Sequence, residues 1–542
     1  MKNKKTLFIL ISLSLVFSLF VTSCDIKSPV DGVELRVNTM PRTTVVNFSI
    51  YDAATSKLIT DEATISFKGI DGSKVISMTN EVLPSIKTEK GIINFAISET
   101  IKVPSKQDPV NVTAVVSVNG YVSSSTQLRI TSPGISSYSI ELASYNNPPK
   151  GVESHETDGK ATANGVEKDI IAKSKDGSGN KAEVTIKKGT VLKNSAGTVL
   201  SGEVKTRVTY FDPQEEQSLN SFPGGFSVEL DGQPKTFISA GFVAIDMKVG
   251  NDKVEQFDKS KVTVDLDVTG VKKEDGSLVS AGDEIPLWSY NENTGAWKRE
   301  GTVVVATTLA KSANGKTTLR ATAQISHLSY WNLDWYGDAC YEGITIRFTG
   351  NCFNQLRVKG KRISDGRYYY SGYVTGGDPN LQLLRAPRNT PSIIEVWNYS
   401  TYPYVKVAEQ QIDNLCGDDV DFPIDYDFGV SEVTLRVSIA CYDDDGTTAI
   451  SRFYPNSNAI WARKWEGNYY GYWTNLGQVV EGEISACLEI GERYQFATYV
   501  NGWIYQDVTP TQALYEFEFS NITEEYGKYD EYKKVIDDIC GN

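Results

Sequence analysis

The stretch VTVDLDV at residues 262–268 alternates apolar and polar side chains along its whole length. Successive side chains of a β-strand point to opposite faces, so this alternation predicts a strand with one buried and one solvated face. The pattern recurs in VELRV (33–37), ATISF (63–67) and VKTRVTY (204–210), and VTAVVSV (112–118) is rich in β-branched residues. Because Gly, Asn and Asp residues separate such runs, the sequence predicts an all-β fold of antiparallel strands.

Length and composition predict several folded modules. The chain has 542 residues, which is enough for about three to five domains. Its 40% hydrophobic and 23% charged residues are typical of a globular protein. Residues 148–180 are rich in Asn, Pro, Gly, Lys and Ser and predict a linker or, alternatively, an exposed edge hairpin. We therefore expect tandem antiparallel β-sandwich modules at residues 25–147, 181–335, 336–430 and 431–542.

A short internal repeat supports two modules in the C-terminal third. ITIRFTGNC (344–352) resembles VTLRVSIAC (433–441), and both are strand patterns that end in cysteine. Chance similarity is the alternative. Apolar residues between 523 and 540 recur mostly at three- and four-residue steps, which predicts a short C-terminal helix.

Two parts of the chain resemble known extracellular modules. NGY (119–121) and ISSYSIEL (135–142) resemble pieces of carboxypeptidase regulatory-like or immunoglobulin-like modules. The block 181–335 resembles a β-sandwich module of cartilage intermediate layer proteins through FPGGF (222–226), a hairpin flanked by tryptophans, and a closing WNLD (331–334). This second resemblance implies an extracellular scaffold without enzymatic activity.

The N-terminus has the layout of a secretory signal. Three lysines precede an apolar run at 7–20, which is shorter than the roughly 20 residues needed to cross a bilayer. The following VTSC (21–24) resembles the lipobox of bacterial lipoproteins, which implies that residues 1–24 are a signal peptide and that Cys24 is lipidated. The alternative is an ordinary signal peptide with an incidental cysteine. We expect a Gram-negative envelope protein anchored in the outer membrane, with its periplasmic or surface orientation left open.

Charge and cysteine content limit the ligands, disulfides and metal sites that we expect. The formal net charge of −14 argues against nucleic-acid binding. Exported chains meet oxidising conditions, so three disulfides are expected among six cysteines, with 15 pairings open. The competing zinc site is disfavoured because there is no C-x-x-C pair, and we expect neither a metal nor a cofactor. The disulfide candidates are Cys340, Cys352, Cys416, Cys441, Cys487 and Cys540.

Aromatic side chains are dense in the C-terminal third. Tyr and Trp offer flat apolar faces with a polar tip, which suit sugar rings and protein interfaces. The alternative is aromatic pairing between neighbouring strands. Two clusters comprise Tyr368, Tyr369, Tyr370 and Tyr373, and Trp397, Tyr399, Tyr402 and Tyr404. The candidate ligand surface is a third cluster, made of Trp461, Trp465, Tyr469, Tyr470, Tyr472 and Trp473.

Two other groups carry weaker signals. Aspartates crowd residues 418–427 and 443–445, where calcium binding is the alternative to solvated turns. His327-Leu328-Ser329 resembles the tail of self-cleaving GAIN-type domains, which would make His327 a base and Leu328–Ser329 the scissile bond. The alternative interpretation is a strand in which the His and Ser have no catalytic role.

These patterns together predict a non-enzymatic, membrane-anchored envelope lipoprotein. We expect it to bind or scaffold, presenting its aromatic C-terminal surface to a glycan or a protein partner, away from the lipid. One alternative is an adhesin or a subunit of an envelope complex. The others are a self-cleaving stalk, broken after Leu328, and a glycan-active enzyme of unrecognised type.

Overall fold

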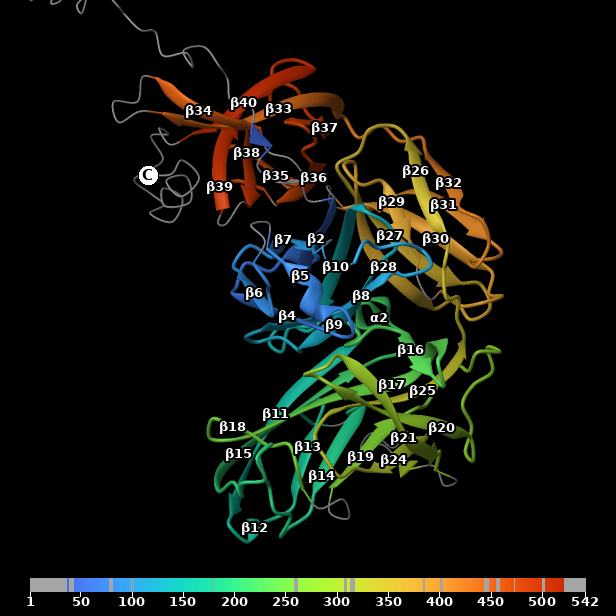
Figure 1. Ribbon diagram of the computed structural model, residues 1–542. Coiled ribbons are helices and arrows are strands. Elements are labelled where there is room, and N and C mark those ends of the chain that lie inside the picture. Colours follow the sequence, from blue (N-terminus) through green and yellow to red (C-terminus); the bar gives the residue numbers. More distant parts are fainter. Residues whose placement is uncertain are drawn as a thin grey trace, which may run out of the picture.

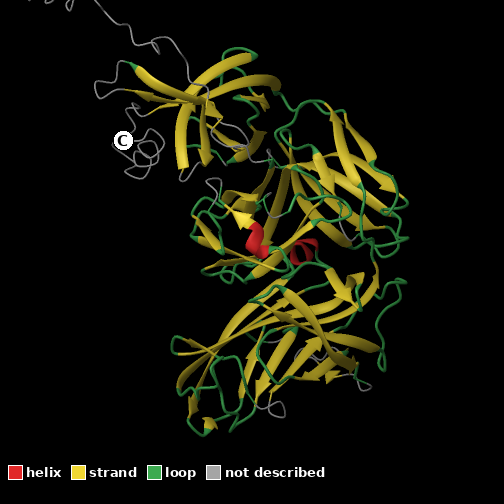
Figure 2. Cartoon of the chain, in the orientation of Figure 1, coloured by secondary structure: helices red, strands yellow, loops and turns green. Residues whose placement is uncertain are grey.

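The computed structural model describes residues 37–38 and 43–520, with gaps at 78–80, 99, 101, 178, 258–261, 307–309, 312–316, 384–385, 400–402, 443–447, 455–458, 472 and 500–502. The regular secondary structure of this part of the chain is almost all strand (Figure 2), and its helices are α2 (Glu216–Asn220) and the 3₁₀ turn η1 (Gly72–Lys74). The predicted all-β, largely antiparallel sandwich architecture is confirmed. None of the described helices has the length and hydropathy needed to span a membrane. The predicted signal peptide, Cys24, the C-terminal helix and Cys540 lie outside the described residues.

The N-terminal module packs two sheets over a core that includes Phe48, Ile65 and Phe95. The sheets have the orders β10-β2-β7-β5, with β3 on β2, and β6-β4-β8-β9. The strands are β2 (Thr44–Asp52), β3 (Lys57–Leu58), β4 (Ala63–Lys68), β5 (Val75–Ile76), β6 (Ser85–Thr88), β7 (Ile92–Ile97), β8 (Val110–Val118), β9 (Ser124–Ile130) and β10 (Gly134–Leu142).

The middle module follows and is the largest. A nine-stranded sheet, with the path β12-β11-β15-β17-β25-β20-β21, faces the four-stranded sheet β13-β14-β19-β24. Its strands are β11 (Val152–Thr162), β12 (Gly165–Val166), β13 (Ile170–Lys173), β14 (Ala182–Ile186), β15 (Gly202–Phe211), β16 (Ser227–Leu230), β17 (Gln233–Val249), β18 (Asp252–Lys253), β19 (Val262–Asp267), β20 (Glu284–Asn291), β21 (Ala296–Val304), β22 (Ala310–Lys311), β23 (Thr317–Thr318), β24 (Arg320–Gln324) and β25 (Tyr330–Asp338).

The prediction of a linker at 148–180 is wrong. Strands β11, β12 and β13 occupy most of that stretch, and β11 pairs with β15 from Val152 to Ala161. Much of β11 is polar because it lies near the sheet edge, where only the two-residue β12 flanks it. The alternative interpretation, an exposed edge hairpin, describes β11 and β12 better.

The third module and the C-terminal module are smaller sandwiches. The third combines β29-β26-β32 with β28-β27-β30-β31, and the C-terminal module combines β34-β33-β37, with β40 on β33, and β36-β35-β38-β39. Their strands are β26 (Thr345–Gly350), β27 (Gln355–Arg362), β28 (Tyr368–Thr375), β29 (Asn380–Gln382), β30 (Ser392–Asn398), β31 (Val405–Ile412), β32 (Val420–Ile424), β33 (Ser431–Tyr442), β34 (Ala449–Tyr454), β35 (Ala459–Lys464), β36 (Thr474–Gln478), β37 (Glu483–Leu488), β38 (Tyr494–Tyr499), β39 (Trp503–Val508) and β40 (Leu514–Ser520).

Three modules close in the same way. Their first strand pairs in parallel with their last, as β2 with β10, β26 with β32 and β33 with β40. The two repeat sequences at 344–352 and 433–441 contribute the first strands β26 and β33 of their modules.

The four tandem modules are packed against one another rather than placed end to end. The N-terminal module lies between the middle and C-terminal modules, and the third module lies alongside (Figure 1). Apolar contacts join the N-terminal module to the middle module around Phe222 and to the C-terminal module around Trp461. Because aromatic side chains are buried at these junctions, the relative positions of the modules are set by packing rather than by linkers.

The N-terminal end of the described chain meets the C-terminal module. Strand β1 (Val37–Asn38) pairs in parallel with β34, so that Val37 faces Phe453 and Asn38 faces Tyr454. A lipid at Cys24 would be only 13 residues away, a reach of roughly 45 Å at full extension. Cys24 itself lies outside the described residues, so presentation of the C-terminal surface away from the lipid stays a prediction.

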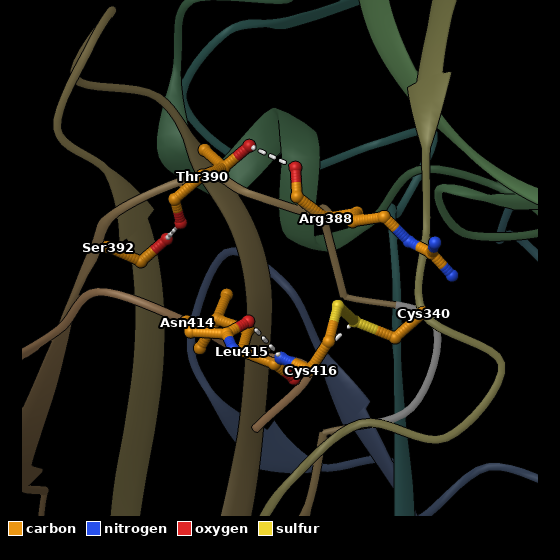
Figure 3. The surroundings of a disulfide bond; sticks show 7 residues. All are labelled: Cys340, Arg388, Thr390, Ser392, Asn414, Leu415 and Cys416. Atoms are coloured by element: carbon orange, nitrogen blue, oxygen red, sulfur yellow. Dashed lines mark hydrogen bonds between the residues drawn. A yellow bond between two sulfur atoms is a disulfide. The ribbon is translucent and has the colours of Figure 1, made fainter.

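Disulfides reinforce the third module and its junction. Cys340–Cys416 lies within the third module, where the side-chain oxygen of Asn414 accepts a hydrogen bond from the Cys416 N–H at 3.0 Å (Figure 3). Cys352–Cys487 joins the third module to β37 of the C-terminal module. Cys441 is also disulfide-bonded.

Candidate functional site

The predicted aromatic ligand surface is divided by the fold. Trp461 is 0% exposed, and Trp473 is buried beside it. Both pack against Tyr51, Leu58 and Ile92 of the N-terminal module. The assignment of Trp461 and Trp473 to a ligand surface is therefore wrong, because their ring faces are already covered by another module. Tyr472 lies outside the described residues.

The remaining members form a small cluster on the hairpin between β35 and β36, which we call the hairpin tip. Tyr469 is 65% exposed, and the rings of Trp465 and Tyr470 meet edge to face at 4.7 Å. The Arg493 guanidinium lies 5.3 Å from the Trp465 ring centroid, and the Tyr470 hydroxyl donates to Asp507 at 2.7 Å. The hairpin tip is thus an amphipathic surface on the outside of the molecule.

The aromatic clusters of the third module lie beside residues that contact other modules. On the outer face of its four-stranded sheet, the rings of Tyr373 and Tyr399 lie 5.3 and 5.1 Å from the Arg357 guanidinium. Lys359 lies 4.6 Å from the Trp397 ring. These rings surround two cations rather than solvent, so they favour the alternative of packing within the chain. Tyr402 lies outside the described residues.

Those two cations bind the neighbouring modules. Arg357 pairs with Glu141 of β10 at 2.6 Å, and both side chains are buried. Lys359 pairs with Glu216 of α2 at 2.7 Å. Removing one partner of a buried ion pair is strongly destabilising, because it leaves an uncompensated charge in a low dielectric. The outer face of this sheet therefore carries ion pairs to both the N-terminal and the middle modules.

A cleft of about 820 Å³ lies at this meeting point, and we call it the inter-module cleft. Its volume is in the range typical of ligand sites. The N-terminal module contributes residues 124–129 and 135–141, the middle module 224–227, and the third module 369–371 and 380–383. Most of these side chains are hydroxyls, amides and tyrosines.

Polar groups meet across the cleft. The Ser137 backbone N–H donates to the Asp378 carboxylate at 3.2 Å, which joins β10 to the third module. Burial raises the pKa of Asp378 above its ordinary value. Glu141 is 6% exposed, and its Oε2 atom has no hydrogen-bond partner among the described residues. Glu141 thus lines the cleft with a carboxylate whose other oxygen is already paired with Arg357.

Sequence reasoning did not find this site. ISSYSIEL (135–142) was noted as a module fragment, and its serines gave no sign that β10 would form a cleft wall. The contributions of β28 and β29 are distant in the chain from β9 and β10, so no spacing within the chain reveals them.

The acidic clusters have ordinary partners. Asp421 pairs with Arg347 at 3.2 Å, and Asp419 accepts the Thr345 N–H at 2.9 Å. Among the described residues, no three His, Cys, Asp or Glu side chains gather as a metal site would require. Residues 443–445 lie outside the described residues.

The His327-Leu328-Ser329 motif lies immediately before β25 in the chain. Ser329 is buried, and its hydroxyl donates to the Tyr290 carbonyl oxygen. The His327 ring packs against Trp331, with centroids 5.0 Å apart. The Ser329 proton is thus directed at β20 rather than at a neighbouring base.

Comparisons with known proteins give little to add to this geometry. No family model matches the sequence, and no curated protein matches it. Among solved structures, the minor pilin GBS52 of Streptococcus agalactiae is 9% identical, with a TM-score of 0.13 and coverage of 34% of this chain and 97% of the pilin. The major pilin subunit BcpA of Bacillus cereus is 9% identical, with a TM-score of 0.13 and coverage of 88% and 99%. TM-scores this low carry no argument about function.

Proposed function

We propose that this chain is a lipid-anchored, non-enzymatic binding protein of the bacterial envelope that holds a partner in the inter-module cleft. The observation that carries the proposal is the cleft itself, about 820 Å³ in volume and lined by three modules. Concave sites between domains, with a few convergent polar groups, are the usual places for ligands. The role is that of an adhesin or of a subunit of an envelope assembly.

The junctions around the cleft support this role. The Arg357–Glu141 and Lys359–Glu216 pairs hold the cleft walls together, and the Cys352–Cys487 disulfide ties the third module to the C-terminal module. Walls that are ordered before binding spare the ligand the entropy of assembling them. A preformed site is what a binding protein requires.

The anchor rests on the sequence at 1–24, where Cys24 follows a lipobox-like segment. Each buried methylene of a lipid chain contributes about 0.8 kcal/mol to the free energy of membrane binding, and two or more chains give stable attachment. Radiolabelled palmitate should enter the wild-type chain, and the Cys24→Ser variant should leave the membrane fraction. A variant that stays in the membrane without label would contradict lipidation.

Filling the cleft tests the binding role. Ser139 lines the cleft, whereas Ile171 is exposed on the middle module. The purified chain without residues 1–24 should bind envelope fragments, and Ser139→Trp should weaken this binding by about tenfold or more, equivalent to about 1.4 kcal/mol. Ile171→Trp is the matched control. Equal binding by both variants, with both folded, would refute the proposal.

The hairpin tip is a second candidate surface, because Tyr469 is exposed beside Trp465. Aromatic faces at such a tip suit the apolar faces of sugars. If it binds glycan, retention on a polysaccharide affinity gel should fall in Trp465→Ala and Tyr469→Ala. Unchanged retention in both variants removes this candidate.

A further inference from the structure

We propose that the partner is an acidic saccharide, whose phosphate or carboxylate group is bound by Lys106, Arg129 and Arg388 in a groove beside the inter-module cleft. We call this groove the basic groove. The inference rests on the function proposed above and names the chemical class of the partner.

The basic groove lies between the N-terminal and third modules and has a volume of about 610 Å³. It adjoins the inter-module cleft, because Lys106, Asn111 and Arg129 line both cavities. On the side of the third module, its lining includes the Cys340–Cys416 disulfide and Arg388, which Figure 3 shows beside each other. A ligand held in the cleft is therefore within reach of the basic groove.

The charge of the basic groove is opposite to that of the whole chain. Its charged lining comprises three cations, Lys106, Arg129 and Arg388, and one carboxylate, Glu342, which gives a local net charge of +2. The formal net charge of the chain is −14. Because cations gathered in a concave surface focus their field, the basic groove attracts anions that the rest of the surface repels.

Arg129 is a cation without a hydrogen-bond acceptor. Its side chain is 13% exposed, and its Nη2 atom lies 3.9 Å from the Glu342 carboxylate, which is beyond hydrogen-bond distance. Its Nε atom is buried and has no hydrogen-bond partner among the described residues. Buried donors are normally paired, and the fork of a guanidinium matches two oxygens of a carboxylate or phosphate. A bound oxyanion would therefore supply the acceptor that Arg129 lacks.

Lys106 and Arg388 contribute further positive charge from two modules. Both are exposed, and neither side chain has an ion pair or a hydrogen bond with another described residue. Arg388 does influence Asp338, whose pKa is lowered by Lys235 and, to a lesser extent, by Arg388. Because Asp338 is already paired with Lys235 at 2.5 Å, it does not neutralise Arg388.

The polar lining favours a saccharide as the carrier of the anionic group. Gln107 lines the basic groove, and Thr126 and Gln127 line the adjoining cleft. Within the described part of the chain, none of these three side chains has a hydrogen-bond partner. Their amides and hydroxyl suit the hydroxyl groups of a sugar. A peptide strand is less suited, because the Ser137 N–H at the edge of β10 is already bonded to Asp378.

Matched saccharides separate the effect of charge from that of shape. The chain without residues 1–24 is titrated in a calorimeter with oligogalacturonate and with its fully methyl-esterified form. A phosphorylated mannan oligosaccharide and its dephosphorylated form are the second pair. We expect the acidic member of at least one pair to bind about tenfold or more tightly than its neutral partner, about 1.4 kcal/mol, and added salt to weaken this binding. Equal binding within both pairs, or no binding at all, overturns the inference.

Charge variants locate the site. Arg129→Gln and Lys106→Gln should each abolish the preference for the acidic saccharide, and Lys106 is exposed, so its replacement leaves the fold intact. The matched control is Arg436→Gln, which removes one charge from the C-terminal module outside both cavities and should leave the affinity unchanged. Thermal unfolding checks that all three variants are folded. An undiminished preference in both Arg129→Gln and Lys106→Gln overturns the site.

Three outcomes separate this inference from the function on which it rests. If Ser139→Trp weakens binding of envelope fragments and Arg129→Gln does not, the binding function stands and this inference fails. If only Arg129→Gln weakens binding, the function proposed for the cleft fails and the basic groove stands alone. Binding of phosphatidylglycerol vesicles, but of neither acidic saccharide, overturns the assignment of a saccharide.

Discussion

Replacing Trp461 tests whether the aromatic cluster of the C-terminal module binds other modules rather than ligand. A fully buried aromatic side chain removes roughly 150–250 Å² from water. At about 25 cal/mol per Å² this corresponds to roughly 4–6 kcal/mol. Trp461 is 0% exposed and touches Trp503 at 5.3 Å between centroids. Because denatured chains already bury part of such surface, we expect Trp461→Ala to lower the free energy of unfolding by about 3–5 kcal/mol.

The control is Trp461→Phe. The Trp461 Nε1 atom has no hydrogen-bond partner among the described residues, so phenylalanine removes an unsatisfied donor and keeps most of the ring contact. We expect a loss below about 1.5 kcal/mol. Urea unfolding followed by circular dichroism measures both variants, and polysaccharide retention should be unchanged in both. The reasoning is refuted if Trp461→Ala unfolds at the wild-type urea concentration while losing retention.

Three further predictions concern the junctions and one buried acid. A Cβ on Gly377 would overlap the Leu476 carbonyl oxygen, so Gly377→Ala should lower the melting temperature, whereas Gly471→Ala, whose nearest neighbour would lie at 3.5 Å, should leave it unchanged in calorimetry. Replacing both Cys352 and Cys487 by serine should lower the stability of the junction between the third and C-terminal modules by about 2–4 kcal/mol. In limited proteolysis the variant should be cut at this junction earlier than the parent chain, which is the control. Burial raises the pKa of Asp334 to about 7, so the folded chain binds more protons than the unfolded chain between about pH 4 and 7, and stability falls as pH rises through this window. Asp334→Asn should flatten that slope in urea titrations, and an unchanged slope would contradict this origin.

The strand pattern was predictable where side chains alternate between core and solvent. VTVDLDV became β19, whose valines at 262 and 264 are buried while Thr263 is not. The linker prediction failed because β11 lies near a sheet edge and carries polar residues on both sides, so composition resembled that of a loop. In that stretch, pairing with β15 decided the structure.

The candidate site was less predictable. Aromatic density at 461–473 was visible in the sequence, but a tryptophan that meets another module looks the same in sequence as one that meets a ligand. The cleft depends on the neighbouring strands β9 and β10 and on the neighbouring strands β28 and β29, and these two pairs lie far apart in the chain. Their convergence arises from long-range docking through Arg357 and Glu141, for which no local pattern exists.

The central position of the N-terminal module has a consequence for how the protein is made. This module is synthesised before the C-terminal module, yet its Tyr51, Leu58 and Ile92 side chains are covered by that module in the folded chain. During translation these side chains remain uncovered while the other modules emerge, and such transient apolar surface promotes misassembly. Correct assembly therefore depends on keeping the N-terminal module apart from other chains until the C-terminal module has been made.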